Sequence, residues 1–343
     1  MKTLITLLTG VLILMSVTSQ ATVWRVNNLG YAATFTGTTA LQDAIDSAAV
    51  AQGDTLHVEA SVVTYGDVTL DKQLVLIGAG YKLGQSGSDN PNLQASAQTS
   101  KVGTITFAAF SESSIVSGLH FVNGNAYFDT GSGNYVVSRC YFQQSGIIFN
   151  NTAPLSQVHI TQCYIYGGSI RLNFGTSSTQ SNISITNNYL YGFVETNPLF
   201  SNNWVVSHNV FDGPYNIVFW DATIRDNIFN TTNLIPLNNN SFSHNLCSSP
   251  SATLPSGSEN HDGLQISQIC TLTGSDDAKW HLINGVNTTY PPSDDTERGI
   301  FGGNTPYKPS GIPAIPAIYQ LSADPTAIQG EPLPVTISTR SNN

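Results

Sequence analysis

Two histidines and an aspartate recur at a regular interval in the second half of the chain. His208, Asp226 and His244 are 18 residues apart, and each stands directly before an asparagine. Two imidazoles and a carboxylate are a ligand set that zinc and other transition metals accept. The same residue types also tolerate the left-handed backbone of a tight bend. Both interpretations stay open, but we favour polar bend residues and expect neither a metal nor another cofactor.

Tyrosines gather slightly earlier in the chain, in pairs separated by one residue or singly. They are Tyr141, Tyr164, Tyr166, Tyr189 and Tyr191. Flat rings with polar tips suit the face of a sugar or a protein partner. We expect these tyrosines to share one face and to form a ligand-binding platform. Alternatively, the apolar and proline-stiffened segment GIPAIPAIYQL (311–321) lies across this face and buries it.

The chain has four cysteines. Cys247 and Cys270 flank a loop, and a disulfide between them would stabilise the fold by roughly 3 kcal/mol on the chain-entropy model. We expect this pair to be bonded if the protein is exported. Cys140 and Cys163 could also pair, although stacked buried thiols are the simpler interpretation.

These residues take their positions from a repeat. Its rows are IVSGLHF (115–121), VVSRCYF (136–142), HITQCYI (159–165), SITNNYL (184–190), VVSHNVF (205–211), TIRDNIF (223–229) and SFSHNLC (241–247). The fifth position of each row, which we call the anchor, reads Leu119, Cys140, Cys163, Asn188, Asn209, Asn227 and Asn245. The spacing between anchors varies around 21 residues, as expected for the coils of a solenoid with unequal loops.

The rows also show which residues point inward. The positions three before and two after the anchor are apolar in the rows, but they are an odd number of residues apart. Because side chains of a strand alternate between faces, one residue between them must break the alternation. We place this bend at the residue before the anchor. The anchor asparagines then point inward, and Asn209 should hydrogen-bond to Asn188 and Asn227 in a ladder.

Three short strands in each repeat predict an all-β fold, a right-handed parallel β-helix. Helical apolar spacing in residues 41–48 predicts a helix that caps its N-terminal end. We assign residues 22–303 to the β-helix with its cap, and residues 304–343 to a proline-rich, irregular tail.

The N-terminus predicts export. Residues 1–21 combine Lys2, an apolar run and small residues before a cleavage point, as in a secretory signal peptide. No later segment is apolar enough to span a membrane. Charged residues make up only 10% of the chain and the formal net charge is −10, which argues against nucleic acid as a partner. We expect the protein to be secreted or displayed on the outer cell surface.

The order of elements resembles the pectin-lyase-like β-helix superfamily. The resemblance rests on LQDAIDSAAVAQGDTLHVEASVVTYGDVTLDKQLVLIGAG (41–80) and the asparagine-bearing coils that follow. The segment GIFGGNTPYKPSGIPAIPAIYQL (299–321) resembles the C-terminal part of secreted β-helix proteins of Bacteroidetes. Enzymes of this superfamily use clustered aspartates, or acidic calcium ligands with an arginine base. The fold also occurs in proteins without catalytic activity.

If the protein is an enzyme, the resemblance directs attention to Arg171, Asp212 and Asp226. Cleavage of a glycosidic bond by acid–base catalysis needs two carboxylates that flank it, yet the coils contain no adjacent pair of acidic residues. We therefore expect a non-catalytic protein that binds a polysaccharide or another cell-surface component, or acts in adhesion. The alternative is a polysaccharide lyase or a glycoside hydrolase.

Overall fold

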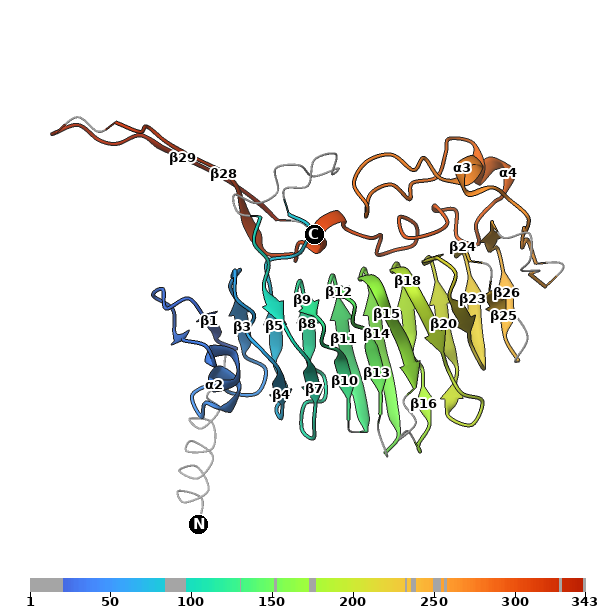
Figure 1. Cartoon of the computed structure of the whole chain (residues 1–343), viewed down its shortest axis with the longest axis horizontal. Coiled ribbons are helices and arrows are strands. Elements are labelled where there is room, and N and C mark those ends of the chain that lie inside the picture. The colour runs from blue at the N-terminus through green and yellow to red at the C-terminus, as the bar shows by residue number, and fades with distance from the viewer. Residues whose placement is uncertain are drawn as a thin grey trace, which may run out of the picture.

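The chain forms a parallel β-solenoid of about eight turns, which confirms the predicted all-β parallel β-helix (Figure 1). The computed structural model describes residues 21–83, 97–129, 131–150, 153–172, 177–231, 233–235, 239–248, 254–255, 258–326 and 329–341. The expected signal peptide therefore lies outside the described residues, except for Ala21. No helix among the described residues is long and apolar enough to cross a membrane.

One side of the solenoid is a parallel sheet to which each successive coil adds a strand. Its strands, in the order in which they pair, are β1 (Val23–Asn27), β3 (Thr55–Val58), β5 (Val75–Ile77), β8 (Ile115–Ser117), β11 (Ser132–Ser138), β14 (Leu155–Thr161), β17 (Ser184–Thr186), β20 (Trp204–Ser207), β23 (Ala222–Arg225) and β26 (Ser241–Ser243). Short strands extend this sheet: β2 (Phe35–Thr36) pairs with β1, β16 (Gln180–Ser181) pairs with β14, and β19 (Ser201–Asn202) pairs with β16.

The other strands form a second parallel sheet that occupies two positions in each coil. The position after the bend holds β6 (Lys101–Val102), β9 (His120–Val122), β12 (Tyr141–Gln143), β15 (Tyr164–Leu172), β18 (Tyr189–Glu195), β21 (Val210–Asp212), β24 (Ile228–Asn230) and β27 (Leu246–Cys247). The next position holds β4 (Val68–Leu70), β7 (Ile105–Phe107), β10 (Ala126–Phe128), β13 (Ile147–Phe149), β22 (Asn216–Val218) and β25 (Asn233–Ile235). β15 and β18 are long enough to occupy both positions.

The predicted capping helix is confirmed as α2 (Ala40–Asp46). Its residues Ala40, Leu41, Ala44 and Ile45 are buried against the end of the solenoid, next to β1, β2 and β4. In the first turn the hydroxyl of Thr39 donates to the carboxylate of Asp43 at 2.7 Å. The helix thereby covers the apolar interior where the first coil would otherwise be open to water.

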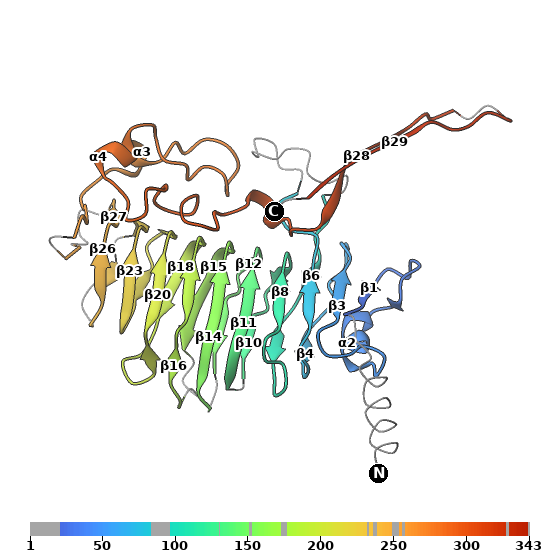
Figure 2. The ribbon, with the colours of Figure 1, turned by 180° about the vertical axis from the view of Figure 1, so that it is seen from behind.

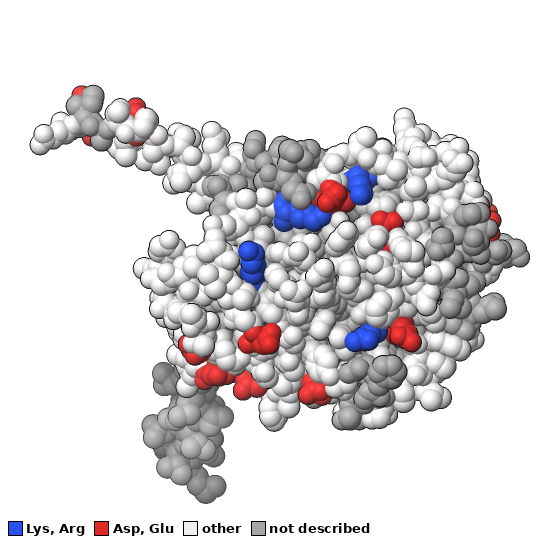
Figure 3. Space-filling view, viewed as in Figure 1, with Lys and Arg blue, Asp and Glu red and all other residues white. Residues whose placement is uncertain are grey.

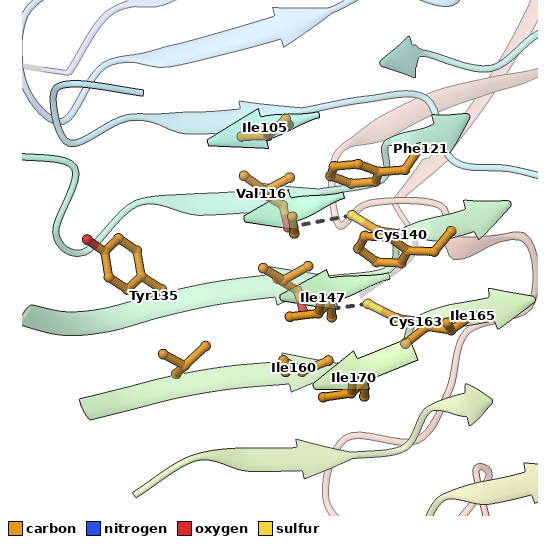
Figure 4. Packing of buried hydrophobic residues seen from close by; sticks show 14 of the residues in the cluster. Ile105, Val116, Phe121, Tyr135, Cys140, Ile147, Ile160, Cys163, Ile165 and Ile170 are labelled. Atoms are coloured by element: carbon orange, nitrogen blue, oxygen red, sulfur yellow. Dashed lines mark hydrogen bonds between the residues drawn. The ribbon is translucent and has the colours of Figure 1, made fainter. Parts of the chain in front are cut away.

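Apolar side chains of successive coils stack in columns inside the solenoid (Figure 4). The rings of Phe121 and Phe142 stack with centroids 4.4 Å apart, and those of Phe107 and Phe128 at 4.5 Å. Such stacking follows from the parallel register, which places equivalent residues of neighbouring coils one strand spacing apart. The buried thiols of Cys140 and Cys163 belong to the same interior.

The anchor asparagines form the predicted ladder. Asn209 donates from Nδ2 to Oδ1 of Asn227 at 3.0 Å, and Asn188 donates to Oδ1 of Asn209 at 3.1 Å. The ladder continues through Asn245 to Asn260, which the repeat did not include. Each of the three amides from Asn209 to Asn245 also donates to a backbone carbonyl of the preceding coil, so buried polar groups are satisfied.

After β27 the chain leaves the coils and runs back along the outside of the solenoid, as Figure 2 shows from behind. This segment, residues 264–313, is called the return segment below. It contains α3 (Ile266–Ile269), α4 (Val286–Thr289) and the 3-10 helix η1 (Pro309–Gly311). The boundary expected at residue 303 falls inside it. The chain then forms an antiparallel hairpin of β28 (Pro316–Ala323) and β29 (Val335–Ser341) that projects from the body (Figure 1).

Candidate functional site

The residue before each anchor has the left-handed backbone that the sequence predicts for the bend. The φ angles are 51° for Arg139, 56° for Gln162, 57° for Asn187, 55° for His208, 56° for Asp226 and 55° for His244. The bend directs these side chains away from the interior. We call them the bend residues.

Bend residues hold the return segment in place, and the order of their contacts is the reverse of the chain order. Asp226 accepts from the backbone N–H of Ser293, and Nε2 of His208 lies 3.3 Å from the carboxylate of Asp294. The side chains of the three earlier bend residues donate to backbone carbonyls: Asn187 to Gly302, Gln162 to Pro306 and Arg139 to Ile312. The return segment is therefore antiparallel to the stacking direction of the coils and is fastened at nearly every coil it crosses.

Two of the three residues considered as metal ligands, Asp226 and His208, are engaged in these contacts with the return segment. The carboxylate of Asp226 is fully buried and binds Ser293 and Arg225, the latter at 3.0 Å. Burial lowers the pKa of His208, although the carboxylates of Asp226 and Asp294 act against this effect. Nδ1 of His244 is buried without a hydrogen-bond partner. Among the described residues, no three histidine, cysteine, aspartate or glutamate side chains are grouped to hold a metal.

The five predicted platform tyrosines lie together and line one cavity of about 420 Å³. Tyr164 stacks on Tyr189 with ring centroids 4.5 Å apart, and Tyr166 stacks on Tyr191 at 4.9 Å. The pairs are in register because β15 and β18 are adjacent parallel strands. Tyr141 meets Tyr164 edge to face at 5.5 Å.

The rest of the cavity comes from segments far from the tyrosines in sequence. Lys82, which follows β5, lies with Nζ 3.9 Å from the ring centroid of Tyr164. Asp276 and Lys279 come from the return segment, and Asp276 is 3.2 Å from Lys82 and 3.9 Å from Lys279. Basic and acidic side chains accordingly alternate along this edge of the body (Figure 3). The return segment thus supplies part of the site as well as covering it.

A second carboxylate, that of Asp212, lies at the other end of the cavity. It accepts from the hydroxyl of Tyr189 at 2.7 Å and from the amide of Asn230 at 2.7 Å. Burial, followed by the charge of Asp212, raises the pKa of Tyr189, and burial lowers the pKa of Lys82. With two lysines and two aspartates, the charged groups that line the cavity sum to zero at neutral pH.

The platform is not the uniformly exposed surface that the sequence suggested. Tyr164 and Tyr189 are each only 2% exposed, whereas Tyr166 is 45% exposed. The buried tyrosines pack against the return segment, where the ring of Trp280 lies 5.4 Å from that of Tyr189. The face is partly covered, but the cover near Tyr189 is the stretch of the return segment around Trp280 and not the segment 311–321 that the alternative interpretation named. The segment around residues 316–321 is in the projecting hairpin.

Arg171, Asp212 and Asp226 do not converge on one point. Arg171 is opposite Glu195 in the pairing of β15 with β18, and Asp212 is opposite Tyr191 in the pairing of β18 with β21. These two positions of β18 are four residues apart, which corresponds to about 13 Å along a strand. Asp226 is buried under the return segment. The structure therefore does not bring this set together as an acid–base site.

The predicted disulfide between Cys247 and Cys270 is not present in the structure. Cys247 packs with the side chains inside the solenoid, whereas Cys270 packs in the cluster between the outer face and the return segment. The strand β27 separates the two clusters, so the two sulfurs lie on opposite sides of it. Burial raises the pKa of Cys270 to about 12.

Lys82, Asp276 and Lys279 of this cavity are not among the site residues predicted from the sequence. For Asp276 and Lys279 the only signal is the succession of acidic, basic and aromatic residues in DDAKW (276–280), which is too short to indicate a site. A second groove, lined by Phe193, Tyr215 and Trp220 among others, was not predicted from the sequence either.

No family model, no curated protein and no solved structure matches this chain.

Proposed function

We propose that this chain is a non-catalytic polysaccharide-binding protein, exported to the cell surface or beyond, with a β-helix of the pectin-lyase-like kind. One observation carries the proposal. All five outward tyrosines of β12, β15 and β18 line a single cavity together with two lysines and two aspartates. Its volume is in the range of ordinary ligand sites.

The chemistry of the lining favours a sugar. The exposed ring of Tyr166, backed by Tyr191, offers a flat apolar surface on which a pyranose face can stack. The carboxylates of Asp212 and Asp276 accept hydrogen bonds from hydroxyls, and the ammonium groups of Lys82 and Lys279 donate them. Because these charges cancel, we expect a neutral glycan to bind better than a polyuronate.

The proposal is tested by affinity electrophoresis in gels that contain neutral or acidic polysaccharides. We expect at least one neutral polysaccharide to retard the protein. Tyr166→Ala should weaken this binding about tenfold, from the loss of one aromatic stacking partner. Tyr31→Ala is the matched control, because Tyr31 is 66% exposed and does not line the cavity.

The same samples distinguish binding from catalysis. A polysaccharide lyase or hydrolase would release reducing ends from the retained polysaccharide, and a lyase would also produce unsaturated, ultraviolet-absorbing products. Retardation without either product supports the proposal. Equal retardation of the wild type and Tyr166→Ala by every polysaccharide, or no retardation at all, would contradict it.

A further inference from the structure

A second groove, of about 410 Å³, opens on the outer face of the same sheet. Its lining comes from the end of β18, from the loop between β21 and β22, from β22 itself and from the turn that follows it. The lining residues are Phe193, Val194, Glu195, Thr196, Pro214, Tyr215, Asn216, Val218 and Trp220, none of which lines the tyrosine cavity.

The floor of this groove is part of the regular sheet. Val194 and Ile217 are opposite each other and point into the interior, which leaves Glu195 and Val218 side by side on the outer face. Beyond the strands, the backbone N–H of Trp220 donates to Oγ1 of Thr196 at 2.9 Å. This bond fixes the turn that presents the indole. The groove is thus held in shape without a ligand.

Three aromatic rings and two polar groups face this groove. Phe193, Tyr215 and Trp220 are each half-buried, while Glu195 and Asn216 are exposed. The guanidinium of Arg171 lies 5.9 Å from the ring centre of Phe193, so this ring already has a cation as its partner. The remaining rings offer stacking surfaces, and the carboxylate and amide offer acceptors and donors. Hydroxyl groups on a compact apolar ring, as in a sugar residue, match this combination.

The groove and the tyrosine cavity are adjoining parts of one surface. Tyr191 lines the cavity, Tyr215 lines the groove, and their rings meet edge to face with centroids 5.2 Å apart. Along β18, Tyr191 and Glu195 are four residues apart, or about 13 Å. A ligand that extends along β18 would pass from one to the other across the contacting rings of Tyr191 and Tyr215.

We infer that the groove around Trp220 is a second sugar subsite, and that the ligand is a linear glycan long enough to occupy both subsites along β18. This inference rests on the proposed function and adds the length and direction of the ligand. Two linked subsites bind a long chain more tightly than either binds a short one, because the second contact is intramolecular.

The test measures affinity by titration calorimetry for a series of oligosaccharides of increasing length, taken from the polysaccharide that retards the protein. For the wild type, affinity should rise steeply at the length that first reaches the groove. Trp220→Ala should abolish that step, weakening the long oligosaccharides about tenfold and leaving the shortest unchanged. Asn216→Ala should reduce the same rise in affinity, and because Asn216 is exposed the substitution should not disturb the fold.

Tyr166→Ala separates this inference from the proposed function, since it should weaken every length. If Tyr166→Ala weakens binding while Trp220→Ala and Asn216→Ala bind long chains as the wild type does, the second subsite is refuted and the proposed function stands. Equal losses for short and long chains in Trp220→Ala would also refute it, because the groove would then be an independent site. A wild type that binds no glycan refutes both.

Discussion

The amide of Gln162 donates from Nε2 to the backbone carbonyl of Pro306 at 2.6 Å, across 144 residues of sequence. This contact joins a bend of the solenoid to the return segment. The same return segment contributes Asp276 and Lys279 to the tyrosine cavity. The bend residues therefore affect the binding site without lining it, because they fix the segment that completes it.

Gln162→Gly should loosen the return segment. Glycine adopts the left-handed backbone of this bend without strain, so the substitution removes the side-chain hydrogen bonds and leaves the coil intact. We expect a loss of about 1 kcal/mol in the free energy of unfolding and faster hydrogen exchange of the amides around residues 300–307. Glycan retention should fall in parallel.

Gln144→Gly is the control for this substitution. Gln144 has a φ of 53°, close to that of Gln162, but its side chain is exposed. Both substitutions relieve the same backbone strain, so their difference reports the contacts with the return segment. Equal exchange rates in the two variants would show that these contacts do not hold the segment.

Asn209→Leu should destabilise the solenoid by about 1–3 kcal/mol, since it leaves the buried partners Asn188 and Asn227 without their bonds. Denaturant unfolding monitored by circular dichroism measures the change. Asn202→Leu, at an exposed position of β19, should change the free energy by less than about 0.5 kcal/mol. A neutral Asn209→Leu variant would mean that the ladder contributes no net stability.

The coils could be predicted from the sequence because each coil has the same local requirements for burial and hydrogen bonding. Asn188, Asn209, Asn227 and Asn245 recur at one position, and a buried amide in a coil has few ways to satisfy its hydrogen bonds. The left-handed bend before each of them followed from the alternation of strand side chains. Repetition therefore supplied the register, the inward face and the location of the outward tyrosines.

The return segment could not be predicted in the same way, because it has no repeat and its contacts are all distant in sequence. The bend residues do contain a signal. Arg139, Gln162, Asn187, His208 and Asp226 differ in chemistry at a position where the backbone requirement is constant. Each of these side chains contacts a different group of the return segment. Their chemical diversity therefore indicates a chain segment that packs over the bends, and not a set of ligands for one metal ion.

Tyr189→Ala should cost about 3–5 kcal/mol of stability, because its ring is 2% exposed and packs between Tyr164 and Trp280. Tyr166→Ala should leave thermal melting nearly unchanged, since that ring is 45% exposed. The contrast shows which tyrosines support the fold and which remain available to a ligand. Similar melting temperatures for the two variants would contradict the burial described above.

Acidification should destabilise the protein between pH 6.5 and 4 through His120. Burial lowers the pKa of this imidazole to about 4, and nearby Lys101 acts in the same direction. In the neutral ring, Nε2 donates to Gln143 and Nδ1 accepts from the hydroxyl of Thr99, each at 3.0 Å. The unfolded chain takes up the proton near pH 6.5, whereas the folded chain does not until about pH 4.

Because the unfolded state binds more protons throughout this interval, the free energy of unfolding falls as the pH falls, by up to about 3 kcal/mol from this residue. Burial also lowers the pKa of His57 and His208, so they contribute with the same sign. Denaturant unfolding at pH 7 and pH 4.5 measures the loss. His120→Gln cannot be protonated but keeps a polar side chain, so it should lose less stability over this interval than the wild type. An equal loss in the wild type and the variant would show that His120 is not the group that titrates.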